Sequence, residues 1–390
     1  MFSGYVRKRD TKKGNSWQII IELGEDPTTG ERLRDYKTVR GNKKDAEAIL
    51  HQKLQELSTG LVVEETKMTV KQHLEIWYEN YVVPNLQPTT IDGYKVNITK
   101  HINPYIGAIP IQSLKPQHVE NLYKTLLDKG LSAKSIVYVH RNLRQALQSA
   151  VTKLQLNRNV CDLVRTPKQT KFKPNVLEEN EIIMLLQAVK DTRLEIPVTI
   201  STMIGLRRGE VLGLKWSDID FERKNVSIKH NLTSSKFAGL RISQPKTSSG
   251  IRTIDLPDGL IDLLLMHYSA QLGDIAVLGD AYQKNDLVCC NRNGTMLNPN
   301  TISKAFLEFL RKNNLKEIRF HDLRHSNATL MLKYKVPIKV ASQRLGHSSV
   351  KITMDTYTHV LDEMDRDAAD KLNDGIFGKM DSVINVPELV

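Results

Sequence analysis

Four short stretches of the sequence combine cationic, titratable and nucleophilic side chains. In chain order they are Gly205-Leu206-Arg207-Arg208-Gly209-Glu210, Lys246, His321-Asp322-Leu323-Arg324-His325, and Leu345-Gly346-His347 with Tyr357 ten residues later. A guanidinium is always charged and its planar fork holds two anionic oxygens. Histidine and lysine can move protons, and an activated tyrosine is a nucleophile. Such a set is suited to chemistry at a phosphodiester. Each stretch alone also fits an ordinary role, such as a helix start, a surface pair, a helix C-cap or a packed aromatic.

Taken together and in this order, the stretches resemble the tyrosine recombinase family, the integrases of phages and conjugative transposons. The family pattern is an Arg in Gly-Leu-Arg-x-Gly-Glu, a hairpin Lys, His-x-x-Arg, Leu-Gly-His and then Tyr, and the match covers about residues 175–365. The N-terminal part is similar to lambda-integrase-like enzymes in order and pattern rather than in motifs. The resemblance implies a site-specific recombinase that integrates and excises a mobile element. Its type IB strand exchange would pass through a 3′-phosphotyrosine intermediate and a Holliday junction.

Two arginines, Arg207 and Arg324, are the expected clamp for the phosphate. Charge spreads over the nonbridging oxygens in the pentacoordinate transition state, and removing one preorganised donor typically costs on the order of 10²–10³ in rate. The family pattern selects Arg207 rather than its neighbour Arg208. His347 can donate a further hydrogen bond, and Glu210 matches the family's acidic position and is expected to orient Arg207. The sequence has no metal-ligand cluster and no glycine-rich phosphate loop, so no metal or other cofactor is expected.

The resemblance makes Tyr357 the nucleophile. A free tyrosine has a pKa near ~10 and is almost fully protonated at neutral pH, so it needs a base or a cationic pocket. His321, one helical turn before Arg324, can take that proton or hydrogen-bond the phosphate. Lys246 resembles the family lysine that protonates the leaving 5′-oxygen, with Arg252 across the turn as a competitor for that position.

The balance of charge favours a polyanionic partner. The 390 residues include 56 Lys and Arg against 44 Asp and Glu, a net charge of +12, which makes nucleic acid the first candidate. The excess is concentrated in residues 61–173, with 16 basic and 8 acidic residues, whereas residues 174–390 have 28 and 27. We therefore expect the middle segment to hold DNA electrostatically and the C-terminal part to use individually placed cations. An inert basic surface is the competing interpretation.

Three segments must position these residues, and they predict a multidomain α+β protein. Residues 1–60 are expected to form a small β-sheet plus a helix, an arm-type DNA-binding domain by resemblance. The segment Trp17–Leu23 is rich in β-branched residues and can pair in a hairpin with Arg32–Val39. A helix should follow from Asn42 to about Leu57, because apolar residues recur there at helical spacing.

Residues 67–166 predict a compact bundle of about four helices. Thr69 can cap the first helix, and Ser132 or Ser135 can cap the last long one. The resemblance makes this segment the helical core-binding (SAM-like) domain. Residues 166–174 are polar and basic with two prolines, which indicates a linker and a domain boundary.

Residues 175–390 predict a mixed, mainly α-helical catalytic domain with a small β-sheet. Val226–His230 has the pattern of a strand. Leu240–Gln244 and Ile251–Leu256 alternate like two strands, and the polar residues between them predict that the two pair as a hairpin carrying Lys246. From Asn300 onward the pattern is helical.

Other classes are disfavoured by the sequence. No apolar run approaches the ~20 residues of a membrane helix, and the first residues lack the apolar core of a signal peptide. A cytoplasmic protein without a membrane partner is expected. The three cysteines, Cys161, Cys289 and Cys290, fit neither a disulfide framework nor a zinc motif.

The expected partner is double-stranded DNA, at core-type and arm-type sites. The resemblance implies that four protomers assemble on two DNA sites, without ATP or metal, and it leaves room for an excisionase or a host DNA-bending protein. Two alternatives stay open. A type IB topoisomerase would relax supercoils with the same residues, and a non-catalytic DNA-binding regulator would use the basic segment alone.

The C-terminal tail contains an apolar cluster of Val383, Ile384, Val386 and Leu389. The cluster could pack onto a neighbouring protomer, as the family's C-terminal segment often does. A frayed terminus is the competing interpretation.

Overall fold

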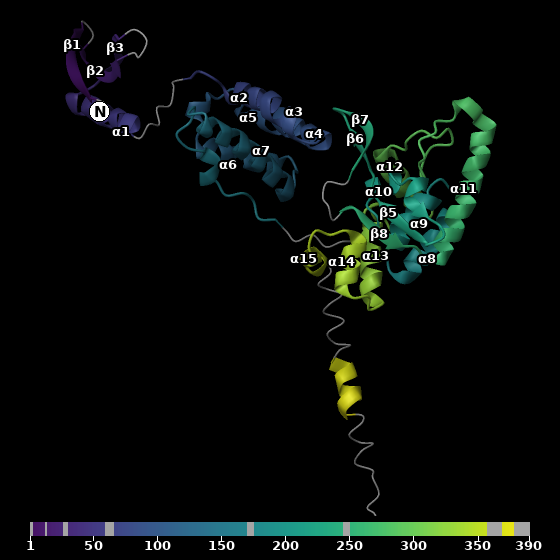
Figure 1. The fold of residues 1–390 in the computed structure, drawn as a ribbon. Helices are drawn as coiled ribbons and strands as arrows, with labels where there is room; N and C mark the ends of the chain where they lie inside the picture. The colour runs from purple at the N-terminus through teal and green to yellow at the C-terminus, as the bar shows by residue number, and fades with distance from the viewer. Residues whose placement is uncertain are drawn as a thin grey trace, which may run out of the picture. The chain divides into compact units, whose positions relative to one another are not determined.

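The computed structural model describes residues 3–11, 14–25, 30–58, 66–169, 175–244, 250–356 and 369–377. The chain divides into two compact units, Met1–Thr170 and Lys171–Val390. The prediction of a multidomain α+β fold is confirmed, with small sheets at the start of the first unit and inside the second (Figure 1).

The N-terminal module is a three-stranded antiparallel sheet with one helix against it (Figure 1). Its elements are β1 (Ser3–Thr11), β2 (Gly14–Glu25), β3 (Arg32–Arg40) and α1 (Lys43–Ser58). Ile19 and Ile21 are two residues apart and therefore share one face of β2, where they are buried with Ala46 and Leu50 of α1. Asn42 caps α1, because its Oδ1 accepts a hydrogen bond from the backbone three residues on at 2.8 Å. The predicted hairpin and helix are confirmed.

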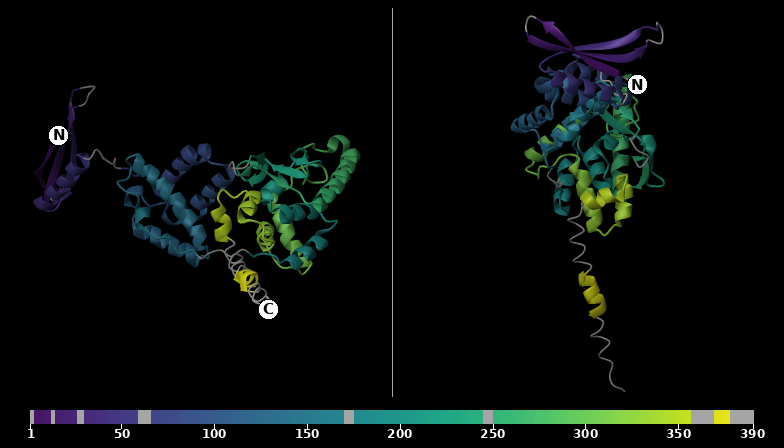
Figure 2. Two further views of the ribbon diagram at one scale, coloured as in Figure 1. Left: turned by 60° about the horizontal axis from the view of Figure 1, so that its bottom comes forward. Right: turned by 90° about the vertical axis from the view of Figure 1, so that its left-hand side faces the viewer.

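The rest of the first unit is helical (Figure 2). Its elements are α2 (Val70–Trp77), α3 (Val83–Asn85), α4 (Pro88–Val96), α5 (Asn103–Ile106), α6 (Pro116–Asp128) and α7 (Ala133–Thr152), with π-helical turns at Tyr78–Val82 and Asn97–Ile102 and 3-10 turns at Ile111–Ser113 and Val160–Leu163. Thr69 caps α2 through a reciprocal hydrogen-bonded pair with Gln72, and Ser132 caps α7. Leu74, Leu143 and other apolar side chains of these helices form one buried core.

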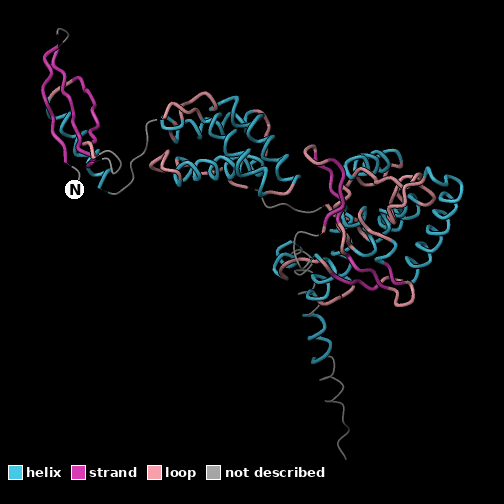
Figure 3. The backbone as a smooth tube through the Cα atoms, turned by 45° about the horizontal axis from the view of Figure 1, so that its top comes forward, coloured by secondary structure: helices cyan, strands magenta, loops and turns pink. Residues whose placement is uncertain are grey.

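The second unit combines two small sheets with a larger set of helices (Figure 3). The helices are α8 (Glu179–Val189), α9 (Glu195–Ile204), α10 (Arg208–Leu212), α11 (Asp258–Leu278), α12 (Pro299–Lys312), α13 (Asp322–Lys333), α14 (Ile338–Leu345) and α15 (Val350–Thr356), with 3-10 turns at Trp216–Asp218 and Gly279–Ala281 and a π-helical turn at Asn373–Phe377. The strands are β4 (Ile219–Asp220), β5 (Asn225–Ile228), β6 (Asn231–Ser235), β7 (Gly239–Ser243) and β8 (Arg252–Asp255). Among the described helices, none is long and apolar enough to cross a membrane.

The strands of this unit form as expected, but the predicted pairing is wrong. β7 pairs with β6, and β8 pairs with β5 in a separate sheet. Gly239 adopts a left-handed conformation with φ of 67°, which closes a tight turn between β6 and β7. β8 joins β5 because Ile254 lies opposite Val226 and both are buried in the core. The segment that contains Lys246 therefore connects two sheets instead of closing one hairpin.

The residues that enter the second unit are fastened to α13. The backbone N–H of Leu177 donates to Ser326 Oγ at 2.9 Å, and Lys333 Nζ lies 2.7 Å from a carboxylate oxygen of Glu178. Because α13 also carries Arg324, the start of the unit is joined directly to the helix of a predicted site residue.

Candidate active site

Arg207 lies in the turn between α9 and α10, and this turn needs a left-handed backbone conformation at Gly205. It directly precedes α10, and Gly205 two residues earlier ends α9 with φ of 68°. A Cβ on Gly205 would lie 2.5 Å from Asn327 Oδ1, so the position needs glycine both for its conformation and for space. The Arg207 side chain donates from Nη2 to the carbonyl oxygen of Gly346 at 2.9 Å. This contact brings the first and last predicted motifs together.

Glu210 is buried between two guanidinium groups. Its Oε1 accepts from Arg207 Nη1 at 2.7 Å, and its Oε2 accepts from Arg252 Nη2 at 3.0 Å. Burial raises the pKa of this carboxyl, but the hydrogen bond and charge of Arg252, followed by the charge of Arg207, outweigh burial and hold it below its ordinary value. The predicted orienting contact from Glu210 to Arg207 is present in the structure.

Arg324 is the second predicted clamp residue, and it is almost completely buried, with 2% of its surface exposed. Its Nη1 donates to the carbonyl oxygen of Gly205 at 2.9 Å. The turn that precedes Arg207 therefore also holds Arg324. Two guanidiniums that are each fixed by hydrogen bonds to the protein make a preorganised site for an anion.

His321 directly precedes α13, one helical turn before Arg324. Its ring meets that of His325 edge-on, with centroids 5.2 Å apart. Partial burial of the ring, then electrostatic repulsion from His325 and Arg324 when the ring is protonated, lower the pKa of His321 to about 4. The imidazole is consequently neutral near pH 7 and able to accept a proton.

His347 follows Gly346, whose left-handed conformation ends α14. Burial, then the charges of Arg324 and Arg207, lower the pKa of His347 to about 3. Its Nδ1 lies 2.8 Å from Thr353 Oγ1 of α15. A neutral ring that accepts this hydrogen bond carries its proton on Nε2, which is the form needed to donate to a phosphate oxygen.

Two predicted site residues, Lys246 and Tyr357, lie outside the described residues, as does the C-terminal tail from residue 378 onward. Tyr357 follows the last residue of α15, and Lys246 stands in the sequence between β7 and β8. Their roles stay predictions.

The structure adds Arg252 to the site. The sequence offered it only as a competitor for Lys246, because no local motif marks a residue whose partners, Glu210 and Arg344, are 42 and 92 positions away. Within the described residues, no group of three His, Cys, Asp or Glu side chains could hold a metal ion.

Comparisons with known proteins agree with this geometry. Residues 175–364 match the phage integrase family, and residues 69–127 match the N-terminal SAM-like domain of phage integrases. A XerC-like tyrosine recombinase of Caldanaerobacter subterraneus subsp. tengcongensis is 29% identical over 92% of this chain and 96% of its own length. The ICEBs1 integrase of Bacillus subtilis is 28% identical over 93% of this chain and 98% of its own length.

Solved structures show the same fold. The Tn1549 transposon integrase in complex with transposon right end DNA has a TM-score of 0.65 at 21% identity, covering 77% of this chain and 99% of that one. A lambda integrase tetramer bound to a Holliday junction has a TM-score of 0.56 at 19% identity, covering 88% and 95%. The fold and the paired arginines thus define a tyrosine recombinase. Within that class, the chain belongs to the phage integrase family.

Proposed function

We propose that this protein is a site-specific DNA recombinase that integrates and excises a mobile genetic element. Tyrosine recombinases break and rejoin DNA, and relatives of this chain include the integrase of Staphylococcus phage L54a and the transposase of transposon Tn916. The observation that carries the proposal is that hydrogen bonds fix both arginines, Arg207 to the turn at Gly346 that precedes a neutral His347, and Arg324 to the turn at Gly205 that precedes Arg207.

The site residues can divide one phosphoryl transfer among them. Tyr357 attacks the scissile phosphate, forming a 3′-phosphotyrosine bond and releasing a 5′-oxygen, while Arg207 and Arg324 hold the nonbridging oxygens. His321 accepts the tyrosine proton, and Lys246 protonates the leaving oxygen. Attack of the freed 5′-hydroxyl on a partner phosphotyrosine reverses the chemistry. One strand exchange then gives a Holliday junction, and a second resolves it.

The first unit supplies DNA affinity. We assign core-site binding to the helical domain, residues 67–166, and arm-site binding to the module of residues 1–60, with residues 175–390 as the catalytic domain. In the module, Tyr5 and Tyr36 lie opposite Ile20 on the face away from α1 and are half exposed. Arg7 and Arg34 are exposed and lie two residues from Tyr5 and Tyr36 on the same strands. Such a surface suits contact with the DNA backbone and base edges.

Assembly on DNA follows from the same proposal. Four protomers would act together on two DNA sites, as the lambda integrase tetramer does on its Holliday junction. An excisionase or a host DNA-bending protein would be an accessory partner. We expect the protein to act in the cytoplasm, where its DNA substrate lies.

Covalent capture tests the proposed function. The protein and its Tyr357→Phe variant are incubated with the DNA that flanks the element, denatured, and the attached DNA ends are sequenced. We expect attachment at one discrete site for the wild type and none for the variant, with equal DNA binding by both. Attachment by the variant would refute the nucleophile. Supercoil relaxation without joined products would instead support a topoisomerase, and binding without attachment a regulator.

A further inference from the structure

Arg252, the first residue of β8, donates hydrogen bonds from all three nitrogens of its side chain. Its Nε donates to the carbonyl oxygen of Arg344 at 2.6 Å, and its Nη1 donates to that of Gly250 at 3.0 Å. Its Nη2 donates to Glu210 Oε2 at 3.0 Å. A buried cation is costly unless it is paired and hydrogen-bonded, and these contacts satisfy that requirement.

Arg252 uses its donors within the protein, because Nε, Nη1 and Nη2 each donate to a protein acceptor. Its side chain is 8% exposed, whereas that of Arg207 is 38% exposed, and the shared carboxylate of Glu210 is 3% exposed. An incoming oxygen can therefore contact Arg207 directly. We expect Arg252 to act through the groups to which it donates, Glu210 and the backbone at Gly250 and Arg344.

The turn that carries His347 packs directly on Arg252. A Cβ on Gly346 would lie 2.8 Å from Arg252 Nη1, and Arg207 donates to the carbonyl oxygen of the same glycine. One guanidinium thus contacts both the carboxylate that orients Arg207 and the turn that presents His347.

We propose that Arg252 is a positioning residue for strand cleavage, which fixes Glu210 and the turn at Gly346 so that Arg207 and His347 meet the same phosphate. The inference rests on the proposed function and deepens it. As the start of β8, Arg252 also anchors the C-terminal end of the segment that contains Lys246. It joins three motifs that are far apart in the sequence.

The test measures single-turnover attachment of the full-length protein to its DNA site. Arg252→Met is compared with Arg252→Lys and with Arg292→Met, a control whose side chain is 77% exposed. We expect Arg252→Met to lose about 100-fold in attachment rate, the order that a small misplacement costs, with DNA affinity unchanged. Lysine keeps the charge but not the fork, so it should recover only part of the rate.

Two further measurements separate positioning from a general loss of structure. The Glu210→Gln/Arg252→Met double variant should be no slower than Glu210→Gln alone, because both changes break one unit. Without Arg252, the pKa of Glu210 rises, so the attachment rate of Arg252→Met should decline on acidification at a higher pH than that of the wild type. The Glu210→Gln background should abolish this difference.

Three results would overturn the inference: a wild-type rate for Arg252→Met, additive losses in the double variant, or an unshifted pH profile. Failure of attachment by both the wild type and Arg292→Met would instead refute the proposed function, and the positioning role with it. Unfolding midpoints of all variants show whether any decrease in activity reflects an unfolded protein.

Discussion

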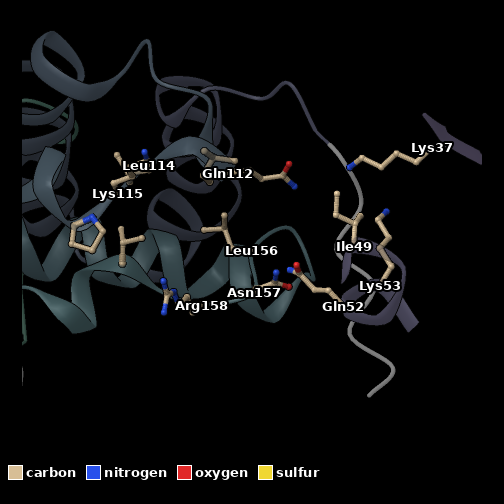
Figure 4. Close-up of a pocket in the computed structure, with 13 residues that line it drawn as sticks. Lys37, Ile49, Gln52, Lys53, Gln112, Leu114, Lys115, Leu156, Asn157 and Arg158 are labelled. Atoms are coloured by element: carbon tan, nitrogen blue, oxygen red, sulfur yellow. The ribbon is translucent and has the colours of Figure 1, made fainter. Parts of the chain in front are cut away.

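The two units of the protein hold positive charge in different ways. In the second unit, three arginines are fixed by backbone carbonyls or by the buried Glu210. In the helical domain, cations such as Lys100 and Arg141 are exposed on helix surfaces. Lys115 and Arg158, whose side chains are shown in Figure 4, are exposed in the segments between helices.

This difference predicts that the exposed cations mainly determine DNA affinity, whereas the fixed arginines mainly determine the rate of strand cleavage. Exposed cations neutralise phosphates wherever they meet them, so they bind DNA of any sequence and lose strength in salt. Cations fixed in a buried network keep one geometry, which is what stabilising a transition state requires. We therefore expect the nearly neutral unit to supply the catalytic rate and the strongly basic segment to supply most of the DNA affinity.

The largest effect should follow from loosening one fixed charge. Arg324→Lys keeps the charge but loses the planar fork and its hydrogen bond to Gly205. We expect the rate of covalent attachment to decline by about 10²–10³ with little change in DNA affinity. Gel-shift and single-turnover assays measure the two quantities, and a parallel loss of affinity would contradict the separation.

A smaller effect should follow from moving a fixed charge without removing it. Gly205→Ala puts a Cβ 2.5 Å from Asn327 Oδ1 at a position with φ of 68°, which costs about 1–3 kcal/mol in stability. Displacement of this turn should also slow covalent attachment, because Arg207 follows the turn in the sequence and Arg324 donates a hydrogen bond to Gly205. Chemical denaturation and attachment kinetics check this, with Gly259→Ala, where a Cβ meets open space, as the control.

Exposed charges should behave in the opposite way. Lys100→Gln with Arg141→Gln should weaken binding equally for specific and random DNA. The slope of log affinity against log salt should become shallower by about 0.9 for each phosphate that the protein no longer neutralises. The attachment rate at saturating protein should be unchanged, and a slower rate would show that these residues take part in the chemistry.

The last prediction concerns pH. The pKa of His347 is lowered to about 3, so the unfolded chain, with a pKa near ~6.5, binds the proton more readily. Stability should therefore decline as pH falls from about 6.5 toward 3. Thermal melts of His347→Gln should show a shallower decline than the wild type. Equal declines would show that His347 does not titrate differently in the folded state.

Local patterns in the sequence predicted much of the fold. The capping residues Thr69 and Ser132, the N-terminal hairpin, and the helix after Asn42 depend on neighbours a few positions away. The pairing of β7 and β8 failed because it is decided by burial of Ile254 against a distant strand. An alternating pattern of apolar residues indicates a strand but does not show with which other strand it pairs.

The site residues also divide into those that local motifs predict and those that only the structure reveals. Motifs identified Arg207, Glu210, His321, Arg324 and His347, and the structure brings the contacts and charges of these residues together. The network of Arg252 could not be predicted, because each of its contacts to Glu210 and Arg344 is long-range. The roles of Lys246 and Tyr357 rest on the family pattern.

The fastening of Leu177 and Glu178 to α13 has a mechanical consequence. Asn175 and Val176 contact Glu317 and Lys316, shortly before α13, and Leu177 and Glu178 contact Ser326 and Lys333 on α13 itself. We therefore expect a force on the chain that joins the two units to act on α13 and the residues just before it. Ser326 is two residues from the guanidinium that would hold the phosphate. A force on the connecting chain should therefore change the position of the helix that carries Arg324.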